Sequence, residues 1–334
     1  MKLTEAQQAA VGHSGCNLQL IACAGSGKTE VVARRVAHML ANRDAYHLEP
    51  RNIVAFTFTE KAAGELKDRI VTRVRESMGH VTGMAEMYVG TIHAFCLDLL
   101  RTELPEFLKY NVLNEVQQIL FVDRNSKKSG LTVATDLKGD PLRRYVDTPR
   151  YINALNILRE ARLAEEALEN CTVRDGLADY ERLLTNKCYL DYSGILLQAV
   201  MALAENERLQ KRIFERVRYV ICDEYQDVNP IQECVIQLLH DGGAEVCVVG
   251  DDDQTIYQWR GSDIRNILNF EDRYRPVEPI RLQENFRSSP AIVELARDFI
   301  SQNGERLEKA MVPTEVQDYE PGDIVALSLS LIHI

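Results

Sequence analysis

The chain has 334 residues, 46% of them hydrophobic and 27% charged, and it contains no run of about 18 apolar residues that could span a membrane. It is therefore expected to be a soluble, cytoplasmic protein of about two domains, without a signal peptide or a membrane partner. Its net charge of −11 argues against a dedicated nucleic-acid binder, although a protein that holds single strands in a local groove can be acidic elsewhere.

The first elements along the chain are a strand and a helix joined by a glycine-rich loop. Residues 18–21 predict a short buried strand, and apolar side chains recur at helical spacing over residues 31–40. Between them, the sequence ACAGSGKT fits the phosphate-binding pattern G-x-x-x-x-G-K-[ST] at every fixed position except the first, where Ala22 replaces glycine. A β-carbon at Gly25 or Gly27 would prevent backbone N–H groups from turning around a phosphate, and the helix N-terminus adds partial positive charge.

We predict that this loop binds nucleotide phosphates. Lys28 would reach the β- and γ-phosphates as a point charge, and the Thr29 hydroxyl would coordinate magnesium. The alternative, a turn that includes Lys-Thr by chance, does not account for the strand before it and the helix after it. The loop residues predicted to contact the nucleotide are Ala22, Cys23, Ala24, Gly25, Ser26, Gly27, Lys28 and Thr29.

The alternation of strand and helix continues to about residue 100. Residues 53–58 predict a strand, and residues 62–74 predict a helix that Thr59 could cap. From residue 101 to residue 190 the strand patterns vanish, and leucine-rich, charged stretches predict a helical insertion.

Strand patterns resume at residues 217–222 and 246–249, and Asn229 followed by Pro230 predicts a helix start. Continuous apolar strands that alternate with helices indicate a parallel sheet covered on both faces. A strand at residues 280–282 is expected to open a second α/β unit. The predicted domains are a first α/β domain of residues 1–100 and 191–275, a helical insertion of residues 101–190, and the beginning of a second α/β domain at residues 276–334.

Two further features concern the end of the chain and its thiols. Residues 324–334 predict an apolar strand with no polar terminus after it, so the chain is expected to be cut short of its full domain. The eight cysteines include no C-x-x-C pair, and most lie in apolar patterns. They are expected to be reduced core residues rather than a disulfide, zinc or iron–sulfur framework.

Two adjacent carboxylates, Asp223 and Glu224, follow an apolar strand. In a parallel sheet the loops at the carboxyl ends of strands face the ligand crevice, so both acids should point toward the phosphate loop. Asp223 would hold magnesium, and Glu224 would orient or deprotonate an attacking water. Alone this pattern is often a solvated strand end, but together with the phosphate loop it predicts a site of ATP hydrolysis.

Residues 223–227, with the sequence DEYQD, resemble the second motif of the UvrD/Rep/PcrA family of superfamily 1 DNA helicases. Other family motifs follow in order at residues 3–7, 22–29, 57–63, 90–95, 249–261 and 283–288. The resemblance implies a P-loop NTPase with a RecA-like parallel sheet, a helical insertion and an incomplete second RecA-like domain. It also implies ATP and magnesium as cofactors, and movement in the 3′-to-5′ direction on single-stranded DNA and at junctions with duplex DNA. The fifth and sixth motifs of the family do not occur before Ile334.

The resemblance assigns roles at the ATP site. Gln7 would read the adenine edge, although a solvent-facing residue at a helix start is the alternative. Phe286 stands where the family usually has tyrosine and would still stack on adenine. Arg287 would reach the γ-phosphate unless it forms only a surface ion pair, and Gln254 would touch the same phosphate.

The resemblance also assigns the DNA contacts. Trp259, the single tryptophan, has polar neighbours, which favours a base-stacking platform over a core position. Phe58 could stack on a base or lie in the core. His93 and Cys96 offer too few ligands for a metal, so His93 is expected to contact the DNA backbone or to pack in the core. The predicted DNA-binding residues are Phe58, Thr91, His93, Tyr257, Trp259 and Arg260.

Three other interpretations remain open. The chain could be the motor part of a helicase–nuclease, a single-strand-binding module switched by nucleotide, or an inactive fragment. Glu224 argues against the switch, because a pure switch does not need a catalytic base beside the magnesium ligand.

Overall fold

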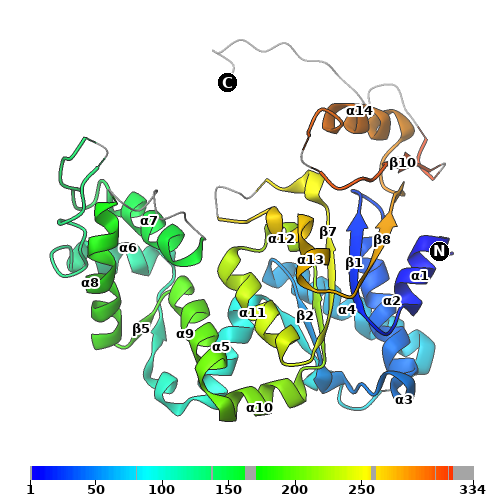
Figure 1. The fold of residues 1–334 in the computed structure, drawn as a ribbon, viewed down its shortest axis with the longest axis horizontal. Coiled ribbons are helices and arrows are strands. Elements are labelled where there is room, and N and C mark those ends of the chain that lie inside the picture. Colours follow the sequence, from blue (N-terminus) through cyan, green and yellow to red (C-terminus); the bar gives the residue numbers. More distant parts are fainter. Residues whose placement is uncertain are drawn as a thin grey trace.

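A single parallel sheet forms the centre of the molecule (Figure 1). The computed structural model describes residues 2–79, 81–136, 138–161, 171–256, 261–304, 306–314 and 316–318. Within this part of the chain, the sheet consists of β1 (Asn17–Ala22), β2 (Ile53–Phe56), β3 (Tyr88–Gly90), β6 (Tyr219–Cys222), β7 (Glu245–Gly250) and β8 (Val277–Leu282). The strands lie in the order β3-β2-β6-β7-β1-β8, and every neighbouring pair is parallel. The predicted α/β class with a P-loop NTPase sheet is confirmed, and the loops that follow β1, β2, β6 and β7 meet at one edge.

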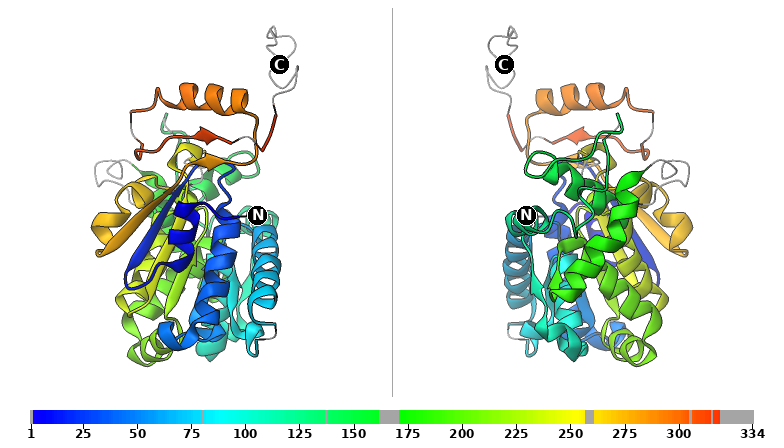
Figure 2. Two further views of the ribbon diagram at one scale, coloured as in Figure 1. Left: turned by 90° about the vertical axis from the view of Figure 1, so that its right-hand side faces the viewer. Right: turned by 90° about the vertical axis from the view of Figure 1, so that its left-hand side faces the viewer.

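Helices cover both faces of the sheet (Figures 1 and 2). Successive strand residues alternate between the two layers: Val220 and Cys222 of β6 belong to one core cluster, whereas Tyr219 and Ile221 belong to the other. Because both faces are covered, the central strands β2 and β6 are buried at every residue and mostly apolar, as the sequence pattern indicated. The first layer contains α5 (Ile92–Glu103), α9 (Tyr192–Glu205) and α11 (Pro230–Asp241), and the second contains α1 (Glu5–Gly12), α2 (Lys28–Ala41) and α4 (Glu60–Met78).

Local capping signals fix where two of these helices begin. The Thr59 hydroxyl accepts a hydrogen bond from the Ala62 N–H at 3.1 Å, and Asn229 caps α11 with Pro230 in its first turn. Both predicted caps are confirmed. The strand predicted at residues 53–58 ends earlier, at Phe56, because the chain must turn before Thr59 to start α4.

The insertion has a core of its own and lies to the left of the sheet in Figure 1. It is built mainly from α6 (Glu115–Arg124), α7 (Thr148–Glu160) and α8 (Thr172–Asn186). The expectation that strands are absent here was wrong, because β4 (Asn111–Val112) and β5 (Tyr189–Leu190) pair in parallel. Two residues are too few to produce a strand pattern in the sequence. A buried ion pair of 2.6 Å joins Arg159 to Asp191, the N-cap residue of α9, and so ties the insertion to the helices that cover the sheet.

The strand predicted to open a second α/β unit instead completes the first sheet. β8 pairs with β1 along its whole length, from Asn17 opposite Val277 to Ala22 opposite Leu282. Without β8, the outer edge of β1 would carry unpaired N–H and C=O groups, and the long-range pairing that satisfies them cannot be read from local pattern. Beyond β8, α14 (Pro290–Ile300) and the short pair β9 (Glu284–Asn285) and β10 (Val312–Pro313) lie above the carboxyl edge of the sheet (Figure 1).

Four short or peripheral helices complete the described structure, namely α3 (Arg43–Tyr46), α10 (Glu207–Arg216), α12 (Arg265–Leu268) and α13 (Phe270–Arg273). None of the helices in the described ranges is long and apolar enough to cross a membrane. All eight cysteines are free thiols, and Cys23, Cys96, Cys222 and Cys247 are buried whereas the other four are partly exposed. The apolar strand predicted at residues 324–334 lies outside the described residues.

Candidate nucleotide-binding site

The phosphate loop connects the carboxyl end of β1 to α2 and has the backbone shape that its glycines predict. Gly25 and Gly27 adopt left-handed conformations, with φ of +69° and +82°. A β-carbon on Gly25 would lie 2.8 Å from the Arg287 Cβ atom and 2.8 Å from the Asn285 Oδ1 atom. Gly27 precedes α2 and has no side chain to cap it, so the first N–H groups of this helix are available to an anion.

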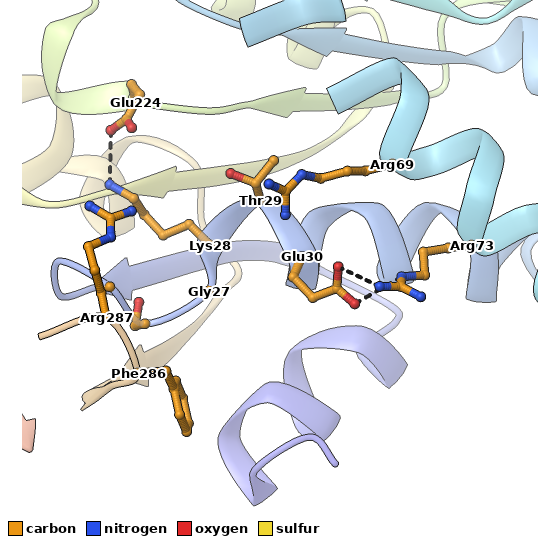
Figure 3. A pocket seen from close by; sticks show the side chains of 11 residues that line it. Gly27, Lys28, Thr29, Glu30, Arg69, Arg73, Glu224, Phe286 and Arg287 are labelled. Atoms are coloured by element: carbon orange, nitrogen blue, oxygen red, sulfur yellow. Dashed lines mark hydrogen bonds and ion pairs between the residues drawn. The ribbon is translucent and has the colours of Figure 1, made fainter. Parts of the chain in front are cut away.

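A cavity of about 400 Å³ opens in front of this loop (Figure 3). Residues from β1–α2, α4, the end of β6 and the segment after β9 contribute to it, so it joins parts of the chain that are far apart in sequence. Its lining consists of Gly25, Ser26, Gly27, Lys28, Thr29, Glu30, Arg69, Arg73, Glu224, Phe286 and Arg287. The structure thus brings together most of the residues predicted to contact the nucleotide.

Glu224 faces Lys28 across this cavity. Its carboxylate lies 3.0 Å from the Lys28 ammonium and accepts a hydrogen bond from the Gln226 amide at 2.9 Å (Figure 3). Although burial alone would raise it, the pKa of Glu224 is lowered by the charge of Lys28 and by these hydrogen bonds. Its backbone is left-handed with φ of +52°, an uncommon conformation for a non-glycine residue and one that is frequent where a site fixes a side chain.

Asp223 and Asp227 are buried carboxylates on either side of Glu224 in the chain. Burial, followed by repulsion from Glu224, raises the pKa of each to about 6, and Lys28 only partly opposes this. The Oδ1 atom of Asp227 has no hydrogen-bond partner among the described residues. Buried acids with raised pKa values and an unpaired oxygen fit a divalent cation, which would relieve their repulsion.

The described residues contain no cluster of three or more His, Cys, Asp or Glu that could hold a metal alone. Mg²⁺ is usually bound by one or two carboxylates together with phosphate and water oxygens. Thr29 and Asp223, the predicted magnesium ligands, supply a hydroxyl at the cavity wall and a carboxylate at the end of β6.

Gln7 lies beneath the phosphate loop and is buried, so the solvent-facing alternative was wrong. Its amide nitrogen donates to the Ser26 carbonyl at 2.9 Å, and its amide oxygen accepts from the Thr4 N–H at 3.1 Å, which closes the cap of α1. The amide nitrogen therefore ties α1 to the phosphate loop, and the amide oxygen closes the cap of α1.

The segment around β9 closes the cavity from the opposite side. The Asn285 amide donates to the Ala24 carbonyl at 2.8 Å, and the Phe286 N–H donates to the Gly25 carbonyl at 3.0 Å. The Asn285 Oδ1 atom also accepts from the N–H groups of Arg287 and Ser288 at 2.8 Å. These bonds hold Phe286 and Arg287 at the cavity, where the sequence predicted an adenine-stacking ring and a phosphate-binding guanidinium.

A second cavity, of about 240 Å³, lies on the other side of Glu224. Phe58, Thr91 and His93, three of the predicted DNA contacts, line it together with Asp223 and Glu224. Phe58 lies beyond the end of β2 and is partly exposed, whereas Phe56 is fully buried. The two cavities therefore share Glu224 as a common wall.

Comparison with known proteins identifies the family of this chain. The family model described as UvrD/REP helicase N-terminal domain matches residues 3–275. The chain belongs to the UvrD/REP helicase family.

Individual members of the family are similar over most of this chain. The ATP-dependent DNA helicase PcrA of Bacillus subtilis (strain 168) is 32% identical over 310 residues, which cover 92% of this chain and 40% of that helicase. The ATP-dependent DNA helicase UvrD1 of Mycobacterium leprae (strain TN) is 34% identical over 330 residues, with the same two coverages. This UvrD/REP family chain thus spans about 40% of the length of the curated relatives that it matches.

Not every predicted residue of this UvrD/REP family chain lies at a cavity. Gln254 is absent from the lining of the nucleotide cavity, and its amide donates to the Asp251 carboxylate at 2.5 Å. Tyr257, Trp259 and Arg260 lie outside the described residues, so their predicted contact with DNA stays a prediction.

Thr91 and His93, two of the three predicted DNA contacts that line the second cavity, have partners within the protein that can be named. The Thr91 hydroxyl caps α5 and donates to Glu60 at 2.8 Å. Burial lowers the pKa of His93 to about 4, so its imidazole is neutral at pH 7. The His93 ring contacts the ring of Tyr192 edge to face, with the centroids 5.7 Å apart.

Sequence reasoning did not anticipate Arg69 and Arg73 at the nucleotide cavity, or Tyr192 beside the second cavity. Tyr192 begins α9 and is 45% exposed, so it is an aromatic side chain at the surface beside His93. Arg69 and Arg73 reach the nucleotide cavity from α4, and Arg73 pairs with Glu30 at 2.9 Å. Their spacing of four residues on a predicted helix was the available signal, since it places both on one face. No comparable signal marked Tyr192.

Proposed function

We propose that this chain binds MgATP in the cavity in front of the phosphate loop and forms the ATP-hydrolysing part of a DNA helicase or translocase that moves on single-stranded DNA. One observation carries the proposal: Glu224 is a wall of both the nucleotide cavity and the cavity lined by Phe58, Thr91 and His93. A residue in this position can respond to both ligands. The relatives PcrA and UvrD1 are ATP-dependent DNA helicases, which agrees with this function.

The residues of the chain divide the chemistry among them. Lys28 and the uncapped N-terminus of α2 would bind the phosphates, while Arg287 would approach from the segment after β9. Thr29 and Asp223 would hold magnesium, which neutralises charge on the transferred phosphoryl group. The phosphates of ATP would compete with the Glu224 carboxylate for Lys28, because both bind the same ammonium. Glu224 would then be free to accept a proton from the attacking water.

Nucleic acid would lie over the second cavity. Phe58 lines this cavity, and the exposed ring of Tyr192 contacts His93, another lining residue. Trp259 is proposed as a further stacking platform. A step on single-stranded DNA would follow from closure of the two sides of the nucleotide cavity on ATP and from their reopening after hydrolysis. The 3′-to-5′ direction and a preference for junctions between single-stranded and duplex DNA belong to this proposal and rest on the family resemblance.

The test is Glu224→Gln in the full-length protein. The substitution keeps size and hydrogen bonding but removes the base, so MgATP should bind with nearly the parental affinity while DNA-stimulated turnover falls about 100-fold or more. Glu65→Gln is a matched control, because the Glu65 side chain is 59% exposed and lies outside both cavities. Unchanged turnover in Glu224→Gln would show that Glu224 is only a strand-end acid.

A further inference from the structure

A lysine from the segment after α14 is buried among three aspartates at the end of β7. The Lys309 ammonium lies 2.9 Å from Asp251 and 3.2 Å from Asp253, and it also donates to Asp252. Its side chain is only 1% exposed, and those of Asp251 and Asp252 are exposed by 1% or less. Although burial alone would lower it, the pKa of Lys309 is raised by the aspartates, so the ammonium stays charged. Because removing charges from water costs free energy, a cluster buried to this extent is stable only when its charges are paired with one another.

Two more contacts join the same segment to the same turn. The Arg306 guanidinium binds Asp253 through two bonds of 2.6 and 3.0 Å, and the Leu307 N–H donates to Asp252 at 2.8 Å. Neither Arg306 nor Leu307 bonds to Asp251. Lys309 is therefore the residue of this segment that pairs with Asp251 in the described structure.

Asp251 connects this cluster to the nucleotide cavity. Its carboxylate accepts the Gln254 amide at 2.5 Å, and its backbone N–H donates to Gln226 at 3.0 Å. Gln226 in turn donates to Glu224 at 2.9 Å, and Glu224 pairs with Lys28 at 3.0 Å. An unbroken line of bonded residues thus runs from the phosphate loop to Lys309.

We propose that Lys309 is a positioning residue for ATP hydrolysis: by pairing with Asp251, it balances the carboxylate that holds Gln254. In the observed state the Gln254 amide is bound to Asp251, and Gln254 does not line the nucleotide cavity. When Gln254 leaves to reach the γ-phosphate, Asp251 would lose a partner in a buried site, and Lys309 supplies the compensating charge. Without Lys309, Asp251 would retain Gln254 more strongly. This inference rests on the proposed ATP site.

The test measures how well the protein distinguishes ATP from ADP, as the ratio of the dissociation constants of ADP and of a non-hydrolysable ATP analogue with Mg²⁺. In Lys309→Met this ratio should fall about tenfold, because γ-phosphate contacts are lost. In Arg306→Met, which cuts the same segment from Asp253 but leaves Asp251 paired, the ratio should stay within about twofold of the parent. In the full-length protein, Lys309→Met should also lower kcat about tenfold with little change in KM for ATP.

A double-mutant cycle decides whether Lys309 acts through Gln254. Adding Lys309→Met to Gln254→Ala should cause no further loss of the ratio, since the amide that Lys309 helps to release is already gone. Additive losses, or equal losses in Lys309→Met and Arg306→Met, would overturn the inference. If Lys309→Met does not fold, Lys309→Met/Asp252→Asn removes one excess buried charge and takes its place in every comparison. A parent that fails to bind MgATP would instead contradict the proposed function.

Discussion

Asp223→Asn should stabilise the folded chain at neutral pH, although it removes a carboxylate proposed to hold magnesium. Asp223 is only 8% exposed, and burial and the neighbouring Glu224 raise its pKa from the ordinary 3.8 to about 6. A pKa difference of about 2 between folded and unfolded chains corresponds to about 3 kcal/mol. The ionised form of Asp223 therefore costs the fold up to that amount, and asparagine, which keeps an oxygen for the Glu224 N–H at 3.0 Å, removes the cost.

The pH dependence gives this prediction a definite sign. Below pH 3.8 Asp223 is protonated in both states, so parent and variant should be equally stable with respect to this group. As the pH rises from about 4 to about 6, the unfolded chain loses the proton while the folded chain holds it, and the folded parent becomes relatively less stable. Above about pH 6 the difference should be constant.

Thermal unfolding of parent and variant at several pH values between 4 and 8, without magnesium, measures this difference. The control is Asp298→Asn, because the Asp298 side chain is 75% exposed. We expect Asp223→Asn to melt above the parent at pH 7.5 and close to it at pH 4, with no such trend in the control. A variant that melts below the parent at pH 7.5, or a difference in melting temperature that is independent of pH, would show that ionised Asp223 does not destabilise the fold.

Two other substitutions test the two cavities separately. Lys28→Ala should weaken MgATP binding at least about tenfold, because it removes the ammonium at the phosphate loop. Equal MgATP affinities of parent and variant in calorimetry would show that this loop does not bind the phosphates. Tyr192→Ala should weaken binding of single-stranded DNA by about 1–3 kcal/mol while MgATP affinity stays unchanged, and unchanged binding in a fluorescence titration would show that Tyr192 only packs against His93.

Features that depend on neighbours in the chain were predictable. The phosphate loop follows from glycines at two positions that require left-handed backbone, and the starts of α4 and α11 follow from Thr59 and Asn229, whose side chains bond within one turn. The parallel sheet follows from apolar strands that alternate with helices. Even the pairing of Asp223-Glu224 with the phosphate loop rests on a general rule, that parallel strands end at one edge.

Features that depend on distant partners were decided by the tertiary structure. Gln7 is buried only because α1 packs against the phosphate loop. β8 joins the first sheet as its sixth strand, instead of starting a new sheet, because it pairs with the open edge of β1. Gln254 bonds to Asp251 and does not line the nucleotide cavity. Lys309 pairs with Asp251, 58 positions earlier in the chain, which no local pattern records. The sequence by itself thus determined the main strands and helices around the site and which chemical groups stand at their ends. Burial and long-range pairing decided which of those groups are free to bind a ligand, because each buried polar atom must first find a partner within the fold.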